Sequence, residues 1–332
     1  MKDTIELGSD PFRYKVLANW ENLPPGYSWS EVAAVAVDSH DNVYVFNRGD
    51  HPMIVFDSNG NFLRSWGEGV FVRPHGLTIG PNDTLYCTDD GDHTVRHCDL
   101  DGKVLMTIGT PGKAAKPHGG SPFNRCTHVA IDPKKGDLYI SDGYGNSRVH
   151  KFTSDGQLLF SWGGPGTGPG EFNIPHNIAT DNNGYVYVAD RENHRIQIFT
   201  SEGTYESQWN NMHRPATLFA TAEQHLFVGE LGAGMSVNRS VPNIGPRITV
   251  YDSSGNYLAR IGHLGYGLGI GQFIAPHGIC LDSKGDIYLA EVAKTNISHF
   301  EEPPHQVRSL QKLVRVDCKY GQSREKELSS HH

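Results

Sequence analysis

Residues 174–199 read IPHNIATDNNGYVYVADRENHRIQIF, and this stretch contains the unit from which the rest of the chain is built. Short apolar runs alternate with polar turns that contain Asn, Asp and Gly, a pattern typical of antiparallel β-hairpins. The first two runs of the unit are residues 177–180 and 185–188. Equivalent pairs of runs occur elsewhere in the sequence, beginning near Ala34, Gly76, His128, Ala216 and Gly278. The chain therefore consists of repeats.

The spacing of the repeats indicates their architecture. They recur about every 40–50 residues, which is the period of propeller blades. Each repeat continues with two more strand-like runs, such as residues 148–152 and 157–162 in the third repeat. Six four-stranded antiparallel units predict an all-β fold, a six-bladed β-propeller whose closure protects the sheet edges.

The ring should close through the N-terminus. Residues 14–20 resemble the fourth runs, for example residues 62–66, but no repeat precedes them. We expect this N-terminal strand to be the outer strand of the last blade, beside inner strands at residues 279–282, 287–290 and 313–317. The sequence thus predicts one domain over residues 1–320, followed by a polar tail at residues 321–332.

Composition excludes several classes of partner. The 332-residue chain has a formal net charge of −8, which disfavours a nucleic-acid-binding face. It has no apolar run long enough to span a membrane, and Met1–Glu6 lack the apolar core of a signal peptide. Its five cysteines form no Cys-x-x-Cys pair, which favours a reducing compartment. We expect a cytoplasmic protein that binds neither nucleic acid nor membrane, with the oligomeric state left open.

Three histidines occupy the same phase of the second, fourth and sixth repeats. His75, His176 and His277 each follow a proline. In a ring of repeats, equal phase places these imidazoles around one axis. Three neutral imidazoles leave zinc one open position, which is typical of catalytic zinc. The pattern predicts a divalent transition metal, Zn²⁺ or else Fe, Co or Mn.

Further motifs point to a family. The quoted unit resembles the NHL repeat. In addition, residues 46–51 (FNRGDH), 141–148 (SDGYGNSR) and 189–193 (ADREN) surround the three Pro-His pairs and resemble the lyase domain of peptidylglycine α-amidating enzymes. The resemblance covers nearly all of the chain. It implies a zinc-dependent lyase that cleaves the N–C bond of a peptidyl-α-hydroxyglycine to give a peptide amide and glyoxylate.

The resemblance also implies roles for individual residues. His75, His176 and His277 match the zinc ligands, and Tyr144 matches the active-site tyrosine, which would take the proton of the substrate hydroxyl. Arg48 and Arg191 match two arginines of substrate binding or catalysis. Guanidinium groups suit a carboxylate. The expected partner is therefore a small-molecule substrate that carries a carboxylate.

Several positions depart from the family's pattern. The family's structural calcium (Ca²⁺) would take the backbone carbonyls of Val35 and Leu77, but its aspartate position is Gly278 here. Ala275 replaces a pocket methionine and should enlarge or reshape the pocket. His128 replaces an aspartate, and we consider it as an extra ligand, a partner of a ligand or a residue of the channel wall. The family's disulfide positions carry other residues, namely Asn124, Gly145, Tyr187 and Ile198.

These observations leave three functions open. The first is a metal-dependent lyase that acts on an α-hydroxyglycine-like carbinolamide. The second is a metal-dependent hydrolase or hydratase of a small ester, lactone or amide, which the departures at Ala275, His128 and Gly278 keep open. The third is a non-enzymatic NHL scaffold that binds protein or RNA, and the net charge of −8 counts against it.

Acidic residues recur directly after the second strand-like run of the repeats. We expect them to cap loops or to pair with neighbouring blades. They are Asp89, Asp142, Asp190, Glu230 and Glu291.

Overall fold

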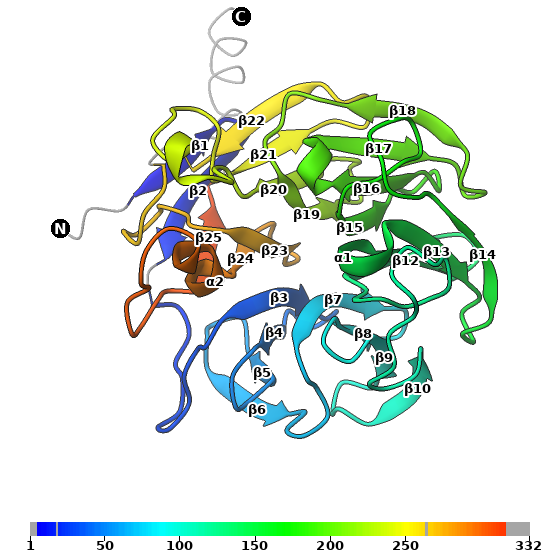
Figure 1. Ribbon diagram of the computed structural model, residues 1–332. Helices are drawn as coiled ribbons and strands as arrows, with labels where there is room; N and C mark the ends of the chain where they lie inside the picture. Colours follow the sequence, from blue (N-terminus) through cyan, green and yellow to red (C-terminus); the bar gives the residue numbers. More distant parts are fainter. Residues whose placement is uncertain (1–4, 18, 263–264, 317–332) are drawn as a thin grey trace, which may run out of the picture.

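The computed structural model describes residues 5–17, 19–262 and 265–316. Six antiparallel sheets surround a common axis (Figure 1). Five sheets have four strands, and the sixth has five. The six-bladed β-propeller that the repeats predict is confirmed.

The strands of each blade follow one another outward from the axis. Blades 1 and 2 contain β3 (Val32–Val37), β4 (Val43–Asn47), β5 (Met53–Phe56), β6 (Phe62–Trp66), β7 (Pro74–Gly80), β8 (Thr84–Asp89), β9 (Thr94–Cys98) and β10 (Val104–Ile108). Blades 3 and 4 contain β11 (His128–Ile131), β12 (Leu138–Asp142), β13 (Arg148–Phe152), β14 (Leu158–Trp162), β15 (Pro175–Thr180), β16 (Val186–Asp190), β17 (Arg195–Phe199) and β18 (Tyr205–Trp209). Blades 5 and 6 contain β19 (Pro215–Ala220), β20 (Leu226–Glu230), β21 (Arg247–Tyr251), β22 (Tyr257–Ile261), β23 (Pro276–Leu281), β24 (Ile287–Glu291) and β25 (Leu310–Arg315).

The N-terminus closes the ring as predicted. Strand β2 (Phe12–Leu17) pairs antiparallel with β25, with Tyr14 opposite Arg315. This strand ends before Trp20, earlier than the sequence suggested. An additional strand, β1 (Glu6–Ser9), pairs with β2 and makes blade 6 five-stranded. Residue 317 and the predicted tail, residues 321–332, lie outside the described residues.

An aspartate–tyrosine contact recurs in four blades. In blade 4, Asp181 accepts hydrogen bonds from the backbone amides of its own turn, including that of Gly184 at 2.9 Å. Its other carboxylate oxygen accepts the hydroxyl of Tyr187, from the second strand, at 3.2 Å. The other three pairs are Asp38–Tyr44, Asp132–Tyr139 and Asp282–Tyr288. The contact ties the first turn of the blade to the second strand, and it explains why this aspartate and tyrosine recur in the sequence.

Four short helices follow the second strands of blades and therefore lie at one end of the ring. The sequence did not predict them. They are α1 (Gly143–Asn146), the 3₁₀ helices η1 (Arg191–Asn193) and η2 (Ser236–Asn238), and α2 (Ala293–Ser298). In Figure 1, α1 lies close to the axis. None of the helices in the described ranges has the length and apolar character needed to cross a membrane.

Tyr14 tests how much the closing strand contributes to stability. Its side chain is fully buried in a cluster with Leu7, Val16 and Leu313. Tyr14→Ala leaves a cavity there, so we expect the free energy of unfolding to fall by about 3–5 kcal/mol in a denaturant titration. The Tyr14 hydroxyl has no hydrogen-bond partner among the described residues. The control Tyr14→Phe should therefore change the stability by less than about 1 kcal/mol. Equal stability of Tyr14→Ala and the unmodified chain would contradict a stabilising role for this strand.

Candidate metal centre and adjoining cavity

Three buried histidines meet at the axis of the ring. His75, His176 and His277 lie near the start of β7, β15 and β23, the first strands of blades 2, 4 and 6. Their ring centroids are 4.7–4.8 Å apart. One ligand atom from each histidine lies within 4.8 Å of the others. The structure thus brings together the three residues that the sequence proposed, and they could hold a metal ion.

Hydrogen bonds between blades fix the orientation of these rings. The Nδ1 atom of His75 lies 2.7 Å from the carbonyl of Thr127, and that of His176 lies 2.7 Å from the carbonyl of Ala216. The Nδ1 atom of His277 lies 2.6 Å from the carbonyl of Ala33. A carbonyl only accepts hydrogen bonds, so each Nδ1 carries the proton. Each Nε2 is consequently left with a lone pair for a metal.

The environment keeps the three imidazoles neutral. Burial lowers the pKa of His75, His176 and His277 well below the usual value for histidine. The positive charges of Arg48 and Arg191 contribute to the lowered pKa of His176 and His277. Metal binding requires the neutral imidazole, so the protonation state fits a metal site.

Carboxylates at the ends of the second strands hold the chain just ahead of each histidine. Asp190 accepts the backbone amide of Asn173 at 2.7 Å, and Glu291 accepts that of Ile274 at 2.7 Å. Asp89 likewise accepts the amide of Arg73 at 2.9 Å. The same kind of contact occurs in blades 3 and 5, as Asp142 with the Asn124 amide and Glu230 with the His213 amide. The predicted loop-capping role of these acids is confirmed.

Tyr144 points at the same place as the histidines. It lies in α1, directly after the second strand of blade 3, where the sequence placed it. Its hydroxyl is 3.1 Å from Nε2 of His75 and 3.0 Å from Nε2 of His176. A phenol hydroxyl group therefore adjoins the candidate metal ligands.

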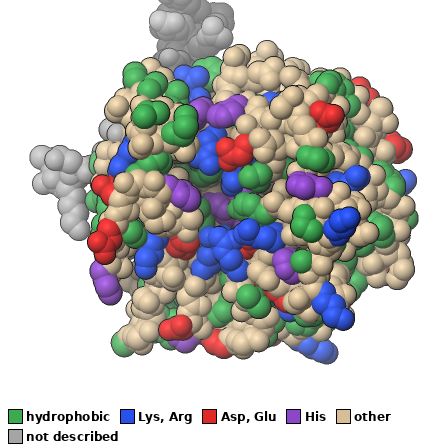
Figure 2. All heavy atoms as spheres, viewed as in Figure 1, with side chains coloured by type: hydrophobic (Ala, Val, Ile, Leu, Met, Phe, Trp, Pro, Cys, Tyr) green, Lys and Arg blue, Asp and Glu red, His purple; other side chains and the backbone are tan. Residues whose placement is uncertain are grey.

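A cavity of about 70 Å³ opens beside Tyr144 and His277. Figure 2 shows Lys and Arg side chains gathered around this central hollow. Three arginines contribute to its wall, namely Arg48, Arg73 and Arg191. The apolar part of the wall includes Leu231, Val292 and Ala275, the residue that replaces the family's methionine.

Arg48 and Arg191 are both held in place by neighbouring groups. Arg48 donates from Nε to the carbonyl of Pro74 at 2.9 Å and pairs with Glu31 at 3.2 Å. Arg191 pairs with Glu192 at 2.8 Å, and its guanidinium lies 5.6 Å from the centre of the Tyr144 ring. The structure therefore places both predicted arginines next to the tyrosine and the histidines.

Sequence reasoning missed three other arginines near this cavity. Arg73 lines the cavity, and Arg125 lies 4.5 Å from the centre of the Tyr144 ring. Arg214 binds Glu192 at 3.0 Å, beside Arg191. A signal was available, because Arg73, Arg125 and Arg214 each lie two residues before the same phase of a repeat, that of His75, Thr127 and Ala216. The pairing of Arg125 with Asp90 and of Arg214 with Glu192 comes from the packing of neighbouring blades.

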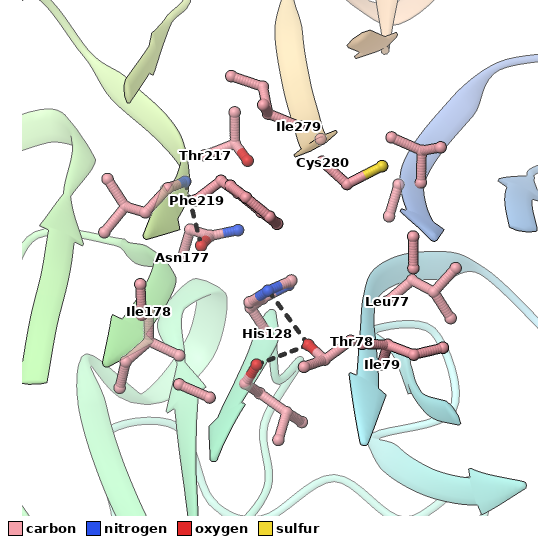
Figure 3. A pocket seen from close by; sticks show the side chains of 18 of the residues that line it. Leu77, Thr78, Ile79, His128, Asn177, Ile178, Thr217, Phe219, Ile279 and Cys280 are labelled. Carbon is pink, nitrogen blue, oxygen red and sulfur yellow. Dashed lines mark hydrogen bonds between the residues drawn. The ribbon is translucent and has the colours of Figure 1, made fainter. Parts of the chain in front are cut away.

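His128 does not join the three histidines. It lines a larger channel of about 310 Å³ that continues along the axis between the first strands (Figure 3). Its Nε2 lies 3.3 Å from the hydroxyl of Thr78. Burial lowers the pKa of His128 to about 4, so the ring is neutral near pH 7. Of the three roles considered for His128, the structure shows the channel-lining one.

The channel does not fit the family's calcium site. Val35, Leu77 and Gly278 line it, but no carboxylate does so within the described ranges. A Cβ atom added to Gly278 would lie 2.8 Å from Cα of Ala34, so a side chain there would require the backbone to move. Calcium prefers carboxylate and carbonyl oxygens. The loss of the carboxylate therefore leaves the two expected carbonyl ligands without their charged partner.

The ring of six antiparallel sheets built from these units defines the class of the protein, an NHL-repeat β-propeller. The NHL repeat family profile matches residues 123–152 and 172–199. The chain is 30% identical to NHL repeat-containing protein 3 of Homo sapiens over 314 residues, which cover 89% of this chain and 86% of that protein. The chain belongs to this family of NHL-repeat proteins.

Two further similarities concern the lyases and the fold. The chain is 30% identical to peptidyl-α-hydroxyglycine α-amidating lyase 1 of Drosophila melanogaster over 262 residues, covering 73% of this chain and 47% of that protein. It thus spans about half the length of that lyase. A gluconolactonase structure from Xanthomonas campestris superposes with a TM-score of 0.61 at 10% identity, covering 91% of this chain and 90% of that one. The second similarity shows the fold alone.

His176→Ala tests the metal centre. The substitution removes one of three ligands, so we expect the transition-metal content to fall from about one ion per chain to a small fraction of that. Elemental analysis of protein purified without chelators measures this, and circular dichroism shows whether the ring still folds. The control His194→Ala removes a histidine whose ring centroid lies 4.6 Å from that of His213 and that lies outside the three-histidine group. No metal in the unmodified chain, even when zinc, iron, cobalt or manganese is supplied, would contradict the assignment.

Calcium addition tests the altered channel. After chelator treatment, we expect millimolar Ca²⁺ to leave the melting temperature unchanged within about 1 °C, because a ligand stabilises only a site that it occupies. Zn²⁺ added to the same sample should raise the melting temperature. A marked rise with Ca²⁺ would show that the channel binds calcium without the carboxylate.

Proposed function

We propose that the chain is a metal-dependent carbon–nitrogen lyase that cleaves an α-hydroxyglycine-like carbinolamide into an amide and glyoxylate or a related aldehyde acid. One observation carries this proposal. The Tyr144 hydroxyl lies 3.0–3.1 Å from the Nε2 atoms of two candidate metal ligands, beside an arginine-lined cavity. The similarity to the amidating lyase of Drosophila melanogaster supports it.

The donor set suits a divalent transition metal, and we propose Zn²⁺. His75, His176 and His277 would hold it through their Nε2 atoms, because each Nδ1 is engaged by a backbone carbonyl. When bound, such an ion supplies Lewis-acid polarisation of a substrate oxygen.

Arg48 and Arg191 would bind the carboxylate of the substrate. Both line the cavity, and the contacts of Arg48 with Pro74 and Glu31 fix its guanidinium in place. One water molecule occupies about 30 Å³ of liquid, so a cavity of about 70 Å³ accommodates a group the size of a carboxylate. The acyl arm of the substrate, which is the part attached to the amide nitrogen, must then extend toward solvent.

Tyr144 would act as the base. As a phenolate it removes the proton of the α-hydroxyl group, the carbon–oxygen bond becomes a carbonyl, and the Cα–N bond breaks with its electron pair on nitrogen. Tyr144 then returns the proton to that nitrogen. The step consumes neither water nor an oxidant, and it yields one amide and one aldehyde acid.

The lyase is favoured over the hydrolase and the binding scaffold. A bound metal ion can activate water by itself, so the three imidazoles alone are compatible with hydrolysis. The arginines of the cavity wall and the adjoining Tyr144 hydroxyl favour instead a substrate that carries a carboxylate and gives up a hydroxyl proton. A binding scaffold gives no reason for three buried imidazoles to converge on one point. We also propose a small-molecule partner and a cytoplasmic location, which suits the free buried thiols of Cys87, Cys98, Cys126 and Cys280.

Tyr144→Phe tests the base. With α-hydroxyhippurate as substrate and release of glyoxylate as the signal, we expect kcat to fall by about 10²–10⁴-fold, the usual contribution of a positioned base. The metal content should stay the same, because the phenylalanine keeps the ring and all three histidines. Tyr185→Phe is the matched control, since Tyr185 is exposed in the first turn of blade 4.

The possible outcomes separate the parts of the proposal. Full activity of Tyr144→Phe would remove the tyrosine from the mechanism. No glyoxylate from the metal-loaded unmodified chain would remove the lyase function for this substrate.

A further inference from the structure

The mouth of the cavity contains more positive than negative charge. Five arginines form ion pairs there, but they share only three carboxylates. The arginines are Arg48, Arg73, Arg125, Arg191 and Arg214, and the carboxylates are those of Glu31, Asp90 and Glu192. Because the whole chain has a net charge of −8, this local excess is not a property of the surface in general.

The excess is divided between two separate groups. In the first, Arg73 and Arg125 both bind Oδ2 of Asp90, at 2.5 and 2.7 Å. In the second, Arg191 and Arg214 both bind Oε1 of Glu192, at 2.8 and 3.0 Å. Each group therefore has two positive charges and one negative charge, and each can accept one anion.

The first group is a built site. Asp90 is completely buried, so it holds its two arginine partners from the interior of the protein. Arg73 donates to it only through Nη1, and Arg125 only through Nε and Nη2. The other guanidinium N–H groups have no hydrogen-bond partner among the described residues, and the two side chains are 35% and 43% exposed. Guanidinium N–H groups that are held in place and have no partner are suited to bind the oxygen atoms of an anion.

The position of this group relates it to the substrate. Arg73 lines the cavity, whereas Arg125 covers the Tyr144 ring at 4.5 Å and reaches solvent. The group thus extends from the cavity outward, which is the direction that the acyl arm must take.

We propose that Arg73 and Arg125 form a second anion subsite, and that the preferred substrate carries a second negative charge, such as a carboxylate, on the acyl arm that is not cleaved. This inference rests on the proposed function for the direction of the arm. One carboxylate of the substrate occupies the cavity beside Arg48 and Arg191, and the second neutralises the excess charge of the Arg73–Asp90–Arg125 group.

Uncleavable ligands test the subsite without turnover. Hippurate derivatives lack the α-hydroxyl group, and 4-carboxyhippurate carries two negative charges, whereas 4-carbamoylhippurate has nearly the same shape and carries one. We expect calorimetry on the metal-loaded chain to give about tenfold tighter binding of the carboxy compound, as one charge-assisted hydrogen bond provides. In Arg125→Gln and Arg73→Gln, the two ligands should bind within about twofold of each other, because the second anion has lost a partner.

Two further variants control for charge and folding. Arg64→Gln makes the same change in charge at an arginine that pairs with Asp101, away from the cavity, and should keep the tenfold preference. Arg125→Lys keeps the positive charge, so this variant should keep most of the preference for the carboxy compound. Melting temperatures show that each variant is folded.

Two results would overturn the subsite. One is equal binding of both ligands by the unmodified chain, and the other is an equal weakening of both ligands in Arg125→Gln, which would indicate general attraction of anions. A preserved preference in a metal-loaded chain that releases no glyoxylate from α-hydroxyhippurate or from its 4-carboxy derivative would refute the proposed lyase for these substrates and leave the subsite in place.

Discussion

The hydrogen bond from a histidine Nδ1 to a backbone carbonyl of the next blade is the contact on which the site depends. It occurs three times, at 2.6–2.7 Å. A free imidazole rotates and exchanges its proton between two nitrogens, whereas this bond fixes both the rotation and the tautomer. The carboxylates of Asp89, Asp190 and Glu291 secure the chain just ahead of each histidine. The propeller thus presents three preorganised donors before any ion binds.

Much of the fold was predictable because the same pattern of strands and turns recurs in every repeat of the sequence. The aspartate–tyrosine contact, the glycine-containing turns and the apolar runs each mark one position of a blade. The number of blades and the closure through β2 followed from these marks. Strand β1 and the four short helices did not, because β1 is a fifth strand with no counterpart in the other blades and helices of three to six residues have no periodicity of their own.

The candidate site was predictable to the extent that it is repeated or resembles a known family. His75, His176 and His277 share a phase, and Tyr144, Arg48 and Arg191 match motifs. Arg73, Arg125 and Arg214 also share a phase, two residues before the positions of His75, Thr127 and Ala216. The ion pairs of Arg125 with Asp90 and of Arg214 with Glu192 were not predictable, because contacts between residues of neighbouring blades leave no local pattern. His128 shows the converse, because its place near the axis was foreseen but its separation from the other histidines depended on three-dimensional packing.

The three histidines come from the even-numbered blades, and the carbonyls that orient them come from the odd-numbered ones, at Ala33, Thr127 and Ala216. Every blade therefore contributes one member of an imidazole–carbonyl pair, either the histidine or the carbonyl that orients it. A fragment that lacked any single blade would lose either an imidazole or the group that aims one. Because Ala33 of blade 1 orients His277 of blade 6, the third ligand is oriented only where the first and last blades meet, so an occupied centre reports a closed ring.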